Sequence, residues 1–288
     1  MKNKTIKKSI VMILSLVFLV NTFAYADTTT VVTLGEDLSA EQKNQMLEMF
    51  NTDEGEATII EVNNKEERKY LEGVASEAQL GTRTISSAYV ELLDEGSGII
   101  VETYNISWVT KEMYQSALVT AGVKDAKVIA AAPFPVSGTG ALTGVLKAFE
   151  QATGKKISEE QKKVANEEVY QTGELGEEIG KDKAGELIRV VKEEVVSKNI
   201  KNPEDIKKII IEIAGDLNIN LNDNQTEKIS ELMEKISKLD LNTEEIKNQL
   251  KDIGKKLDDT IKNNEEVRSL LERILDAIKS FFNSIFNR

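Results

Sequence analysis

The pattern of apolar residues changes once along this chain, near Ser137, and that change constrains the fold more than any other feature. Before it, short β-branched runs alternate with amphipathic helical stretches, in the order β-α-β-α-β-β-α-β. After it, strand signals stop, and helix formers with capped starts continue to the C-terminus. We therefore predict an α+β protein, with a mixed α/β domain over residues 27–137 and an all-helical region, a bundle or a set of helical hairpins, over residues 138–288.

The predicted sheet has strands of mixed direction. Residues Asp94 to Gly98 separate two predicted strands, at 85–93 and 99–108, and the glycines of this segment suit the positive φ angles of a hairpin loop. We expect these two strands to form an antiparallel hairpin. The helical crossovers favour parallel pairs among the other strands. The crossover helices are predicted at 39–50, 64–71 and 110–122, and the other strands at 29–34, 57–62 and 126–132.

The first 26 residues have the form of a secretory signal peptide. Four lysines precede an uncharged apolar run at 10–20, and the segment ends in Ala24-Tyr25-Ala26. This pattern predicts cleavage after Ala26. The alternative is an uncleaved membrane anchor, but the apolar run is shorter than the ~20 residues that span a bilayer.

The chain is strongly acidic and contains neither cysteine nor histidine. Its formal net charge is −12, and loss of the four leader lysines makes it −16. This charge excludes the basic footprint of a nucleic-acid-binding protein. The missing residue types exclude Ser-His-Asp and Cys-His catalysis, the common zinc motifs and disulfides. We predict no cofactor and no metal site, and we expect a soluble secreted protein that either stays in the extracellular medium or associates with the cell envelope.

Several segments resemble one known family. They include VVTLGEDLSAEQ, GTRTISSAYVELL, YNISWVTKEMYQSAL, AGVKDAKVIAAAPFPVSGTGALTGVLKAFE and TGELGEEIG. The chain is similar over most of its mature length to the YpuA-like secreted proteins of spore-forming Gram-positive bacteria, which are defined by a domain of unknown function. The resemblance implies an exported envelope protein and supplies no catalytic residues.

A glycine-rich junction follows the last predicted strand. Ser137, Gly138, Thr139 and Gly140 lie between that strand and a helix, where free backbone N–H groups at a positive helix end suit an anion. The spacing is not that of a P-loop, and no Lys-Ser/Thr follows. Two interpretations remain, a tight turn between domains and a ligand-binding loop made by these four residues.

Two other patterns have both a functional and a structural interpretation. Residues 216–227 place oxygen-bearing side chains as in a calcium loop, but Leu221 stands where the sharp turn needs glycine, which favours an apolar connection between helices. Four aromatic residues could form a sugar-stacking face or belong to the core. They are Tyr89, Tyr104, Trp108 and Tyr114.

Apolar residues recur at alternating three- and four-residue spacing from Ile229 to Ile285, which is a heptad seam. Interruptions near Asn242, Gly254 and Asn263 favour successive antiparallel helices of one bundle, and an intermolecular coiled coil is the alternative. The last predicted helix has a wide apolar stripe, which must be covered. Its own bundle, a partner and a membrane surface are the alternatives, and the membrane is the least favoured. The stripe consists of Val267, Leu271, Ile274, Ile278, Phe281, Phe282, Ile285 and Phe286.

Two classes of function are compatible with these features. The first is a non-catalytic interaction protein of the envelope or the extracellular medium, which binds a protein or envelope partner or a second copy through its C-terminal helices. The second is an extracellular hydrolase that acts on cell-wall glycan or peptide through carboxylates. No spaced catalytic constellation is recognisable, so the first class is favoured, while catalytic residues stay unassigned.

We expect the mature protein to start at Asp27. Intact-mass measurement of the protein in the extracellular fraction checks this, because cleavage after Ala26 removes a defined mass. Retention of residues 1–26 in that fraction contradicts the prediction.

Overall fold

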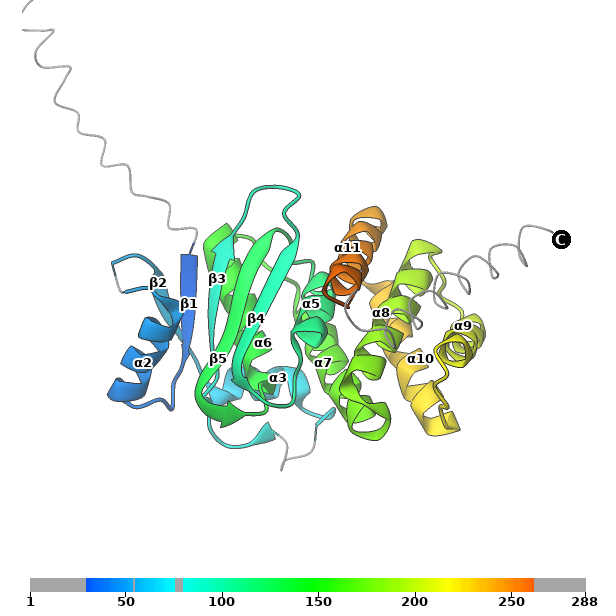
Figure 1. Cartoon of the computed structure of the whole chain (residues 1–288), viewed down its shortest axis with the longest axis horizontal. Coiled ribbons are helices and arrows are strands. Elements are labelled where there is room, and N and C mark those ends of the chain that lie inside the picture. The colour runs from blue at the N-terminus through cyan, green and yellow to red at the C-terminus, as the bar shows by residue number, and fades with distance from the viewer. Residues whose placement is uncertain (1–29, 54, 76–79, 262–288) are drawn as a thin grey trace, which may run out of the picture.

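The computed structural model describes residues 30–53, 55–75 and 80–261, with side chains described as far as residue 255. The predicted leader and the predicted interaction helix from Val267 to Phe286 lie outside these residues. Within them, the elements of the first half follow the predicted order, and the second half is helical (Figure 1). The α+β fold class is confirmed.

Five strands form one mixed sheet in the order β2-β1-β3-β5-β4. Strand β1 pairs parallel with β2 and antiparallel with β3, while β5 pairs antiparallel with β3 and parallel with β4. Each parallel pair is joined by a helical crossover, as predicted, but the crossover through the helix at 64–71 joins β2 and β3, which are not neighbours in the sheet. The strands are β1 (Thr30–Gly35), β2 (Thr58–Val62), β3 (Ser87–Leu92), β4 (Ile99–Ile106) and β5 (Ala126–Val136).

The predicted hairpin between the third and fourth strands is wrong, because β5 lies between them. Its run from Val128 to Ala132 is apolar at every position and buried on both faces, which requires a central place in the sheet. Strand β4, at the edge, buries Ile99 and Val101 and exposes Ile100 and Tyr104. Asp125, just before β5, holds the loop over this end of the sheet, since its Oδ1 accepts from the Gly98 N–H at 2.8 Å.

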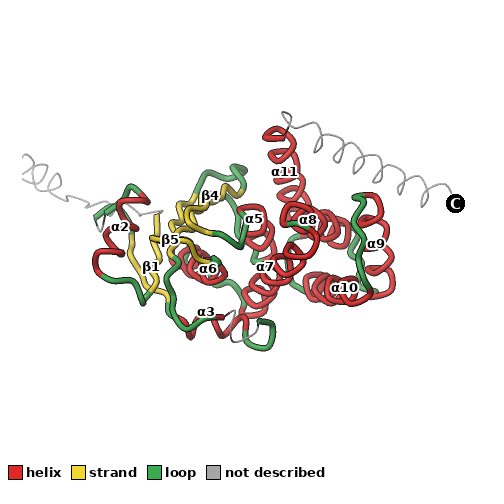
Figure 2. Tube along the Cα trace, turned by 60° about the horizontal axis from the view of Figure 1, so that its bottom comes forward, coloured by secondary structure: helices red, strands yellow, loops and turns green. Residues whose placement is uncertain are grey.

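Helices cover the two faces of the sheet unequally. Helix α2 (Ala40–Phe50) packs over part of one face, where Met46 and Phe50 meet Val32 and Ile129. The opposite face is covered by α6 (Thr139–Thr153), with α3 (Asn64–Leu71) and α5 (Lys111–Thr120) beside it (Figure 2). Helix α6 follows the predicted boundary at residue 137 in sequence, yet it packs on β1 and β3.

The remaining helices continue away from the sheet in successive layers (Figure 1). Helix α7 packs on α5 and α8, and α8 in turn contacts α9, α10 and α11. Polar side chains cap the starts of α7, α9 and α10, with capping boxes at Ser158 and Asn222, whereas α8 follows Gly180 without a side-chain cap. None of the described helices is long and apolar enough to cross a membrane. The helices are α7 (Glu159–Ile179), α8 (Lys181–Ser197), α9 (Pro203–Asp216), α10 (Asp223–Lys238) and α11 (Thr243–Ile261).

The first part of the heptad seam lies inside the chain's own core. Its buried members belong to the apolar cluster that also contains the inner face of the sheet. For α10 and the described part of α11, the seam residues are therefore covered by the chain itself, although α10 packs on α7, α8 and α9 while α11 packs on α8 and α5. These members are Ile229, Leu232, Ile236, Ile246, Leu250 and Ile253.

A buried ion pair joins the sheet's helical layer to the outer helices. Lys192 on α8 and Glu168 on α7 are 0 % and 1 % exposed, and Nζ lies 2.7 Å from Oε1. Two hydroxyls of α5 complete the cluster, since Ser116 Oγ donates to Glu168 Oε1 at 2.6 Å and Thr120 Oγ1 donates to Oε2 at 2.5 Å. The ammonium also donates to the Ser116 carbonyl at 2.7 Å. Burial lowers the pKa of Lys192, which the Glu168 carboxylate opposes.

We expect Lys192→Met to lower the free energy of unfolding by about 3–5 kcal/mol, because it leaves the Glu168 carboxylate buried without its cation. The double variant with Glu168→Leu should recover part of this loss, since no uncompensated charge remains. Urea unfolding of both variants checks the prediction. A double variant that is no more stable than Lys192→Met contradicts it.

Candidate functional site

The predicted ligand-binding loop is a tight junction between β5 and α6. Gly138, the N-cap of α6, has a φ of 95°, a conformation that favours glycine. Its carbonyl accepts a hydrogen bond from the Tyr114 hydroxyl. Ser137 is exposed, Thr139 is half-buried, and their hydroxyl oxygens lie 3.4 Å apart. The four predicted residues are thus together, at the N-terminus of a fifteen-residue helix.

A carboxylate of the chain itself lies against this helix end. Gly140 is buried, and a Cβ atom there would overlap the carboxylate of Glu67 from α3. No side chain caps the first turn of α6 by a hydrogen bond. A negative charge is favourable at the positive end of a helix. The N-terminus of α6, where the sequence pattern suggests that a ligand anion binds, is therefore adjacent to the carboxylate of Glu67.

Glu67 is 7 % exposed, and burial raises its pKa to about 7. Hydrogen-bonding groups of Thr84 and Asn64 act in the opposite direction, and the charges of Asp37 and Glu66 add to the increase. A carboxyl with a pKa near 7 has the acidity that general acid–base catalysis uses. Here it is enclosed by the junction, so its described contacts serve packing.

Tyr114 lies on the inner side of the same junction. It is completely buried, and its pKa is raised, first by burial and then by the neighbouring charge of Glu67. Its role in the described structure is to hold the Gly138 carbonyl. Sequence reasoning identified the glycines but not Glu67, because nothing in the local sequence of α3 marks this glutamate as different from its neighbours.

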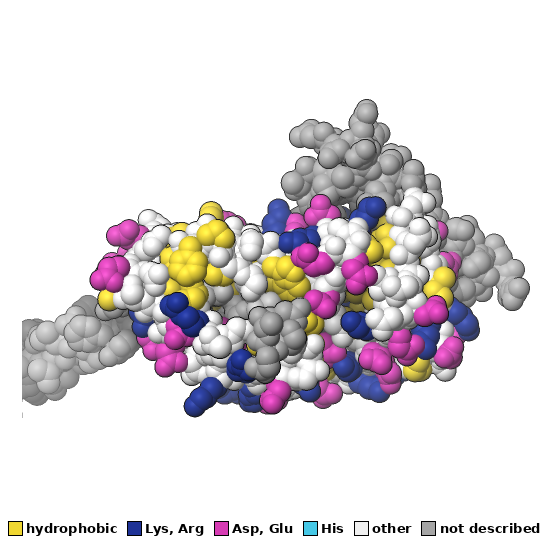
Figure 3. Space-filling model, turned by 90° about the horizontal axis from the view of Figure 1, so that it is seen from below, with side chains coloured by type: hydrophobic (Ala, Val, Ile, Leu, Met, Phe, Trp, Pro, Cys, Tyr) yellow, Lys and Arg dark blue, Asp and Glu magenta, His cyan; other side chains and the backbone are white. Residues whose placement is uncertain are grey.

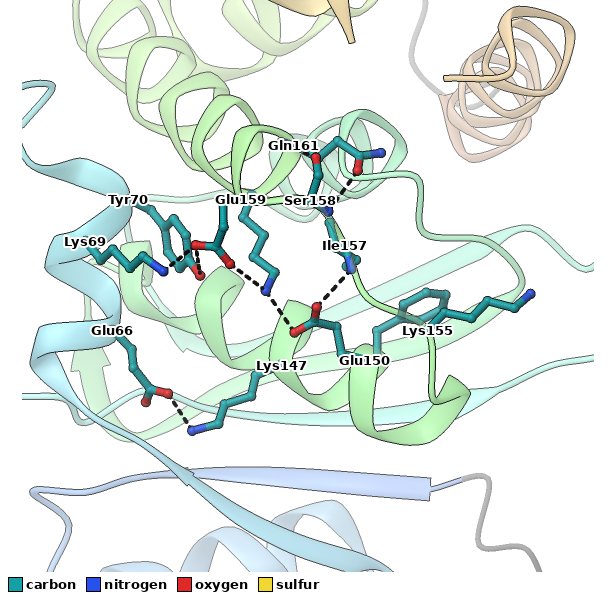
Figure 4. A network of polar contacts seen from close by, with 12 residues as sticks. Glu66, Lys69, Tyr70, Lys147, Glu150, Lys155, Ile157, Ser158, Glu159 and Gln161 are labelled. Atoms are coloured by element: carbon teal, nitrogen blue, oxygen red, sulfur yellow. Dashed lines mark hydrogen bonds and ion pairs between the residues drawn. The ribbon is translucent and has the colours of Figure 1, made fainter. Parts of the chain in front are cut away.

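A second polar network connects α3, α6 and α7 (Figure 4). Lys162 is 8 % exposed and bridges two carboxylates, Glu150 at 2.9 Å and Glu159 at 3.3 Å. Glu159 also pairs with Lys69 and accepts from the Tyr70 hydroxyl at 3.4 Å. The network therefore fixes the start of α7 against α3 and α6.

Charge pairing sets the acidities in this network. The hydrogen bond from Lys69 is the main cause that lowers the pKa of Glu159. Burial lowers the pKa of Lys162, but Glu150 and the other partners raise it by more, so it lies above its usual value. Both groups are therefore held in their charged forms, which suits a structural clamp rather than proton transfer.

Two grooves of similar size lie outside these networks. One, of about 370 Å³, runs between α7 and α10 beside the end of α3 and is called the α7–α10 groove. One of its carboxylates is engaged within the chain: Glu167 Oε1 accepts from Lys235 at 2.5 Å and from Gln171 at 2.9 Å. The other, of about 350 Å³, is next to the connection between α6 and α7 and is called the lysine groove.

The residues of the two other patterns are dispersed in the structure. Tyr114 is core, Trp108 packs on Tyr170 with ring centres 6.0 Å apart, and Tyr89 lies near Phe50 on the other side of the sheet. The aromatic residues thus do not share one face. In the segment 216–227, Leu217 and Ile219 are buried, Asn222 caps α10 and Glu227 pairs with Lys207. Among the described residues, no cluster of three or more carboxylates is placed to hold a metal ion.

The comparisons with known proteins place this chain in a family. Residues 34–253 match the family described as "Protein of unknown function (DUF1002)", and the chain belongs to it. It is 42 % identical over 256 residues to the "Uncharacterized protein YpuA" of Bacillus subtilis (strain 168), a match that covers 88 % of each chain. The expected YpuA-like family is thereby confirmed. No solved structure matches the chain.

We expect Glu67→Gln to change how stability depends on pH. In the wild-type protein, the raised pKa means that the contribution of Glu67 is complete below about pH 4.5 and is lost as pH rises toward about 7. The glutamine variant lacks this loss, so its stability relative to wild type should increase by about 3 kcal/mol across that interval. Urea unfolding at several pH values measures the difference. A control, Glu160→Gln on the exposed side of α7, removes one charge elsewhere, and an E67Q curve parallel to wild type contradicts the prediction.

Proposed function

We propose that this chain is an exported, soluble protein of the cell envelope that binds a partner protein and does not itself catalyse a reaction. The leader-like residues 1–26 support the export, and the uncovered part of the sheet supports the binding. That surface consists of the outward side chains Ile100, Tyr104 and Phe134, and is called the β4 face. These three side chains are 40 %, 45 % and 41 % exposed.

Strand geometry places the β4 face on the side of the sheet that carries α2. Ile99 and Val101 belong to the core cluster on the opposite side, so alternation along β4 turns Ile100 and Tyr104 outward. Val136 packs in the cluster under α2, and alternation along β5 places Phe134 on the same side. Figure 3, which shows the molecule from below, has hydrophobic side chains gathered in patches over the half that contains the sheet. Aromatic and aliphatic side chains on a rigid surface are typical of interaction sites.

The edge of β4 supports a particular kind of partner. Strand β4 has β5 on one side only, so its other edge carries backbone groups that an added strand can bond. Gln115 Nε2 of α5 already donates to the carbonyl of Ile99 at 3.1 Å. By alternation, the backbone groups of Val101 and Thr103 face the same edge. We therefore assign as partner an extended segment of an envelope protein that adds to β4 and packs apolar side chains on the β4 face.

The C-terminal segment is proposed as a second contact. Its apolar stripe from Val267 to Phe286 lies beyond the described residues, and the proposal depends on its sequence pattern alone. Contact with a second copy through this segment, or with a membrane surface, remains open. Hydrolysis of cell-wall glycan or peptide through carboxylates is the alternative function. Glu67 has a pKa raised to about 7, but it is enclosed by the junction and does not face a substrate.

The test uses the mature protein to capture partners from a solubilised envelope fraction. A triple variant, Ile100→Ser, Tyr104→Ser and Phe134→Ser, should lose most of the captured partner, and Thr103→Pro should lose it by blocking the strand edge. Ile211→Ser is the matched control, because Ile211 is 62 % exposed on α9, away from the sheet. Melting curves establish that each variant is folded.

Capture that survives both β4 variants, or that disappears equally with Ile211→Ser, overturns the proposed site. Loss of capture only on deletion of residues 265–288 transfers the contact to the C-terminal segment. Turnover of purified cell wall that is abolished by Glu67→Gln contradicts the non-catalytic proposal and supports the hydrolase.

A further inference from the structure

The lysine groove combines an apolar floor with cationic side chains at its rim. Its walls are the end of β3, the turn between α5 and β5, and the connection from α6 to α7. Phe149 and Ile157 are each 8 % exposed, and with Leu92, Leu93 and Ala121 they supply the apolar surface. The charged residues of the lining are Lys124, Lys155, Lys156 and Asp125.

Two of these lysines have charges that are free for a ligand. Lys155 and Lys156 are exposed, and no carboxylate of the described residues forms an ion pair with either one. Lys124 is partly neutralised, since it pairs with Glu245 of α11. Asp125 is also engaged, because its carboxylate accepts from the Gly98 N–H. The groove is therefore locally positive on a chain whose net charge is −12.

The polar network of Figure 4 holds the segment that carries these lysines. Glu150 Oε1 accepts from the N–H of Ile157 at 2.8 Å, and its other oxygen is held by Lys162. Just before, Thr153 Oγ1 accepts from the Lys155 N–H at 3.2 Å. Figure 4 shows Lys155 extending away from the network while Glu150 points into it. The connection between α6 and α7 is thus fixed at both ends, so binding does not have to order it.

We propose that the lysine groove binds a small amphipathic anion, a phosphate or carboxylate group joined to a short apolar body. The charged group would lie at Lys155 and Lys156, whose ammonium groups can form charge-assisted hydrogen bonds, which are stronger than neutral ones. The apolar body would cover Phe149 and Ile157. A volume of about 350 Å³ is at the lower end of the size of small-molecule sites, which excludes a long polymer as the enclosed part. This site is distinct from the β4 face and does not depend on the proposed partner.

Octyl phosphate is the probe that tests both parts of the site. Titration calorimetry of the mature protein should show saturable binding of one molecule. Octanol and inorganic phosphate, each of which lacks one half of the probe, should bind at least tenfold more weakly, since octanol makes no charge-assisted hydrogen bond and inorganic phosphate covers no apolar surface. Added salt should weaken the binding of octyl phosphate.

The double variant Lys155→Glu and Lys156→Glu should reduce affinity for octyl phosphate at least tenfold. Its matched control is Lys65→Glu with Lys183→Glu, two exposed lysines on α3 and α8 that change the net charge equally. Equal binding by both double variants overturns the proposal, as does equal binding of octanol. Binding to phosphatidylglycerol vesicles without binding of octyl phosphate also overturns it, because it indicates a membrane surface. Should the glutamate variant melt at a lower temperature, Lys155→Gln with Lys156→Gln repeats the test.

Discussion

The buried pair of Glu168 and Lys192 is the interaction on which the arrangement of the two halves depends. It lies where α5, from the sheet half, meets α7 and α8, and each of its charged atoms is satisfied by a partner or by the hydroxyls of Ser116 and Thr120. A buried and fully hydrogen-bonded charged pair restricts the relative placement of the three helices more than apolar contacts alone. Because α8 then contacts α9, α10 and α11, the geometry of the outer helices follows from this point.

Much of the fold could be predicted because short sequence patterns, such as capping residues and apolar periodicity, determine where helices and strands begin and end. The predicted helix start at Ser39 is confirmed by a capping box with Gln42, and α3 has the predicted limits. The hairpin failed because strand order is not a local property. The glycine-containing loop indicates that the chain turns between β3 and β4, but it does not indicate whether these strands pair. The apolar run from Val128 to Ala132 has to be buried on both faces, and β5 therefore lies between them.

The site was less predictable for a related reason. The glycines at 138 and 140 are visible in sequence as a loop, whereas their neighbour Glu67 comes from a helix some seventy residues earlier. A buried glutamate in α3 has the same local pattern as the exposed glutamates beside it. Likewise, Lys155 and Lys156 form an ordinary polar pair in the sequence, and only the fold places the apolar side chains of Phe149 and Leu92 next to them.

The central position of β5 also has a consequence for the order in which the chain can fold. Strands β2, β1 and β3 can pair early, but β4 has no partner until β5 arrives, because β5 is its neighbour in the sheet. A chain that emerges from its N-terminus therefore cannot close the sheet before Val136 has emerged. Pairings between residues so far apart in sequence are slow to form. The sheet of such a chain stays open while roughly its first half is being made.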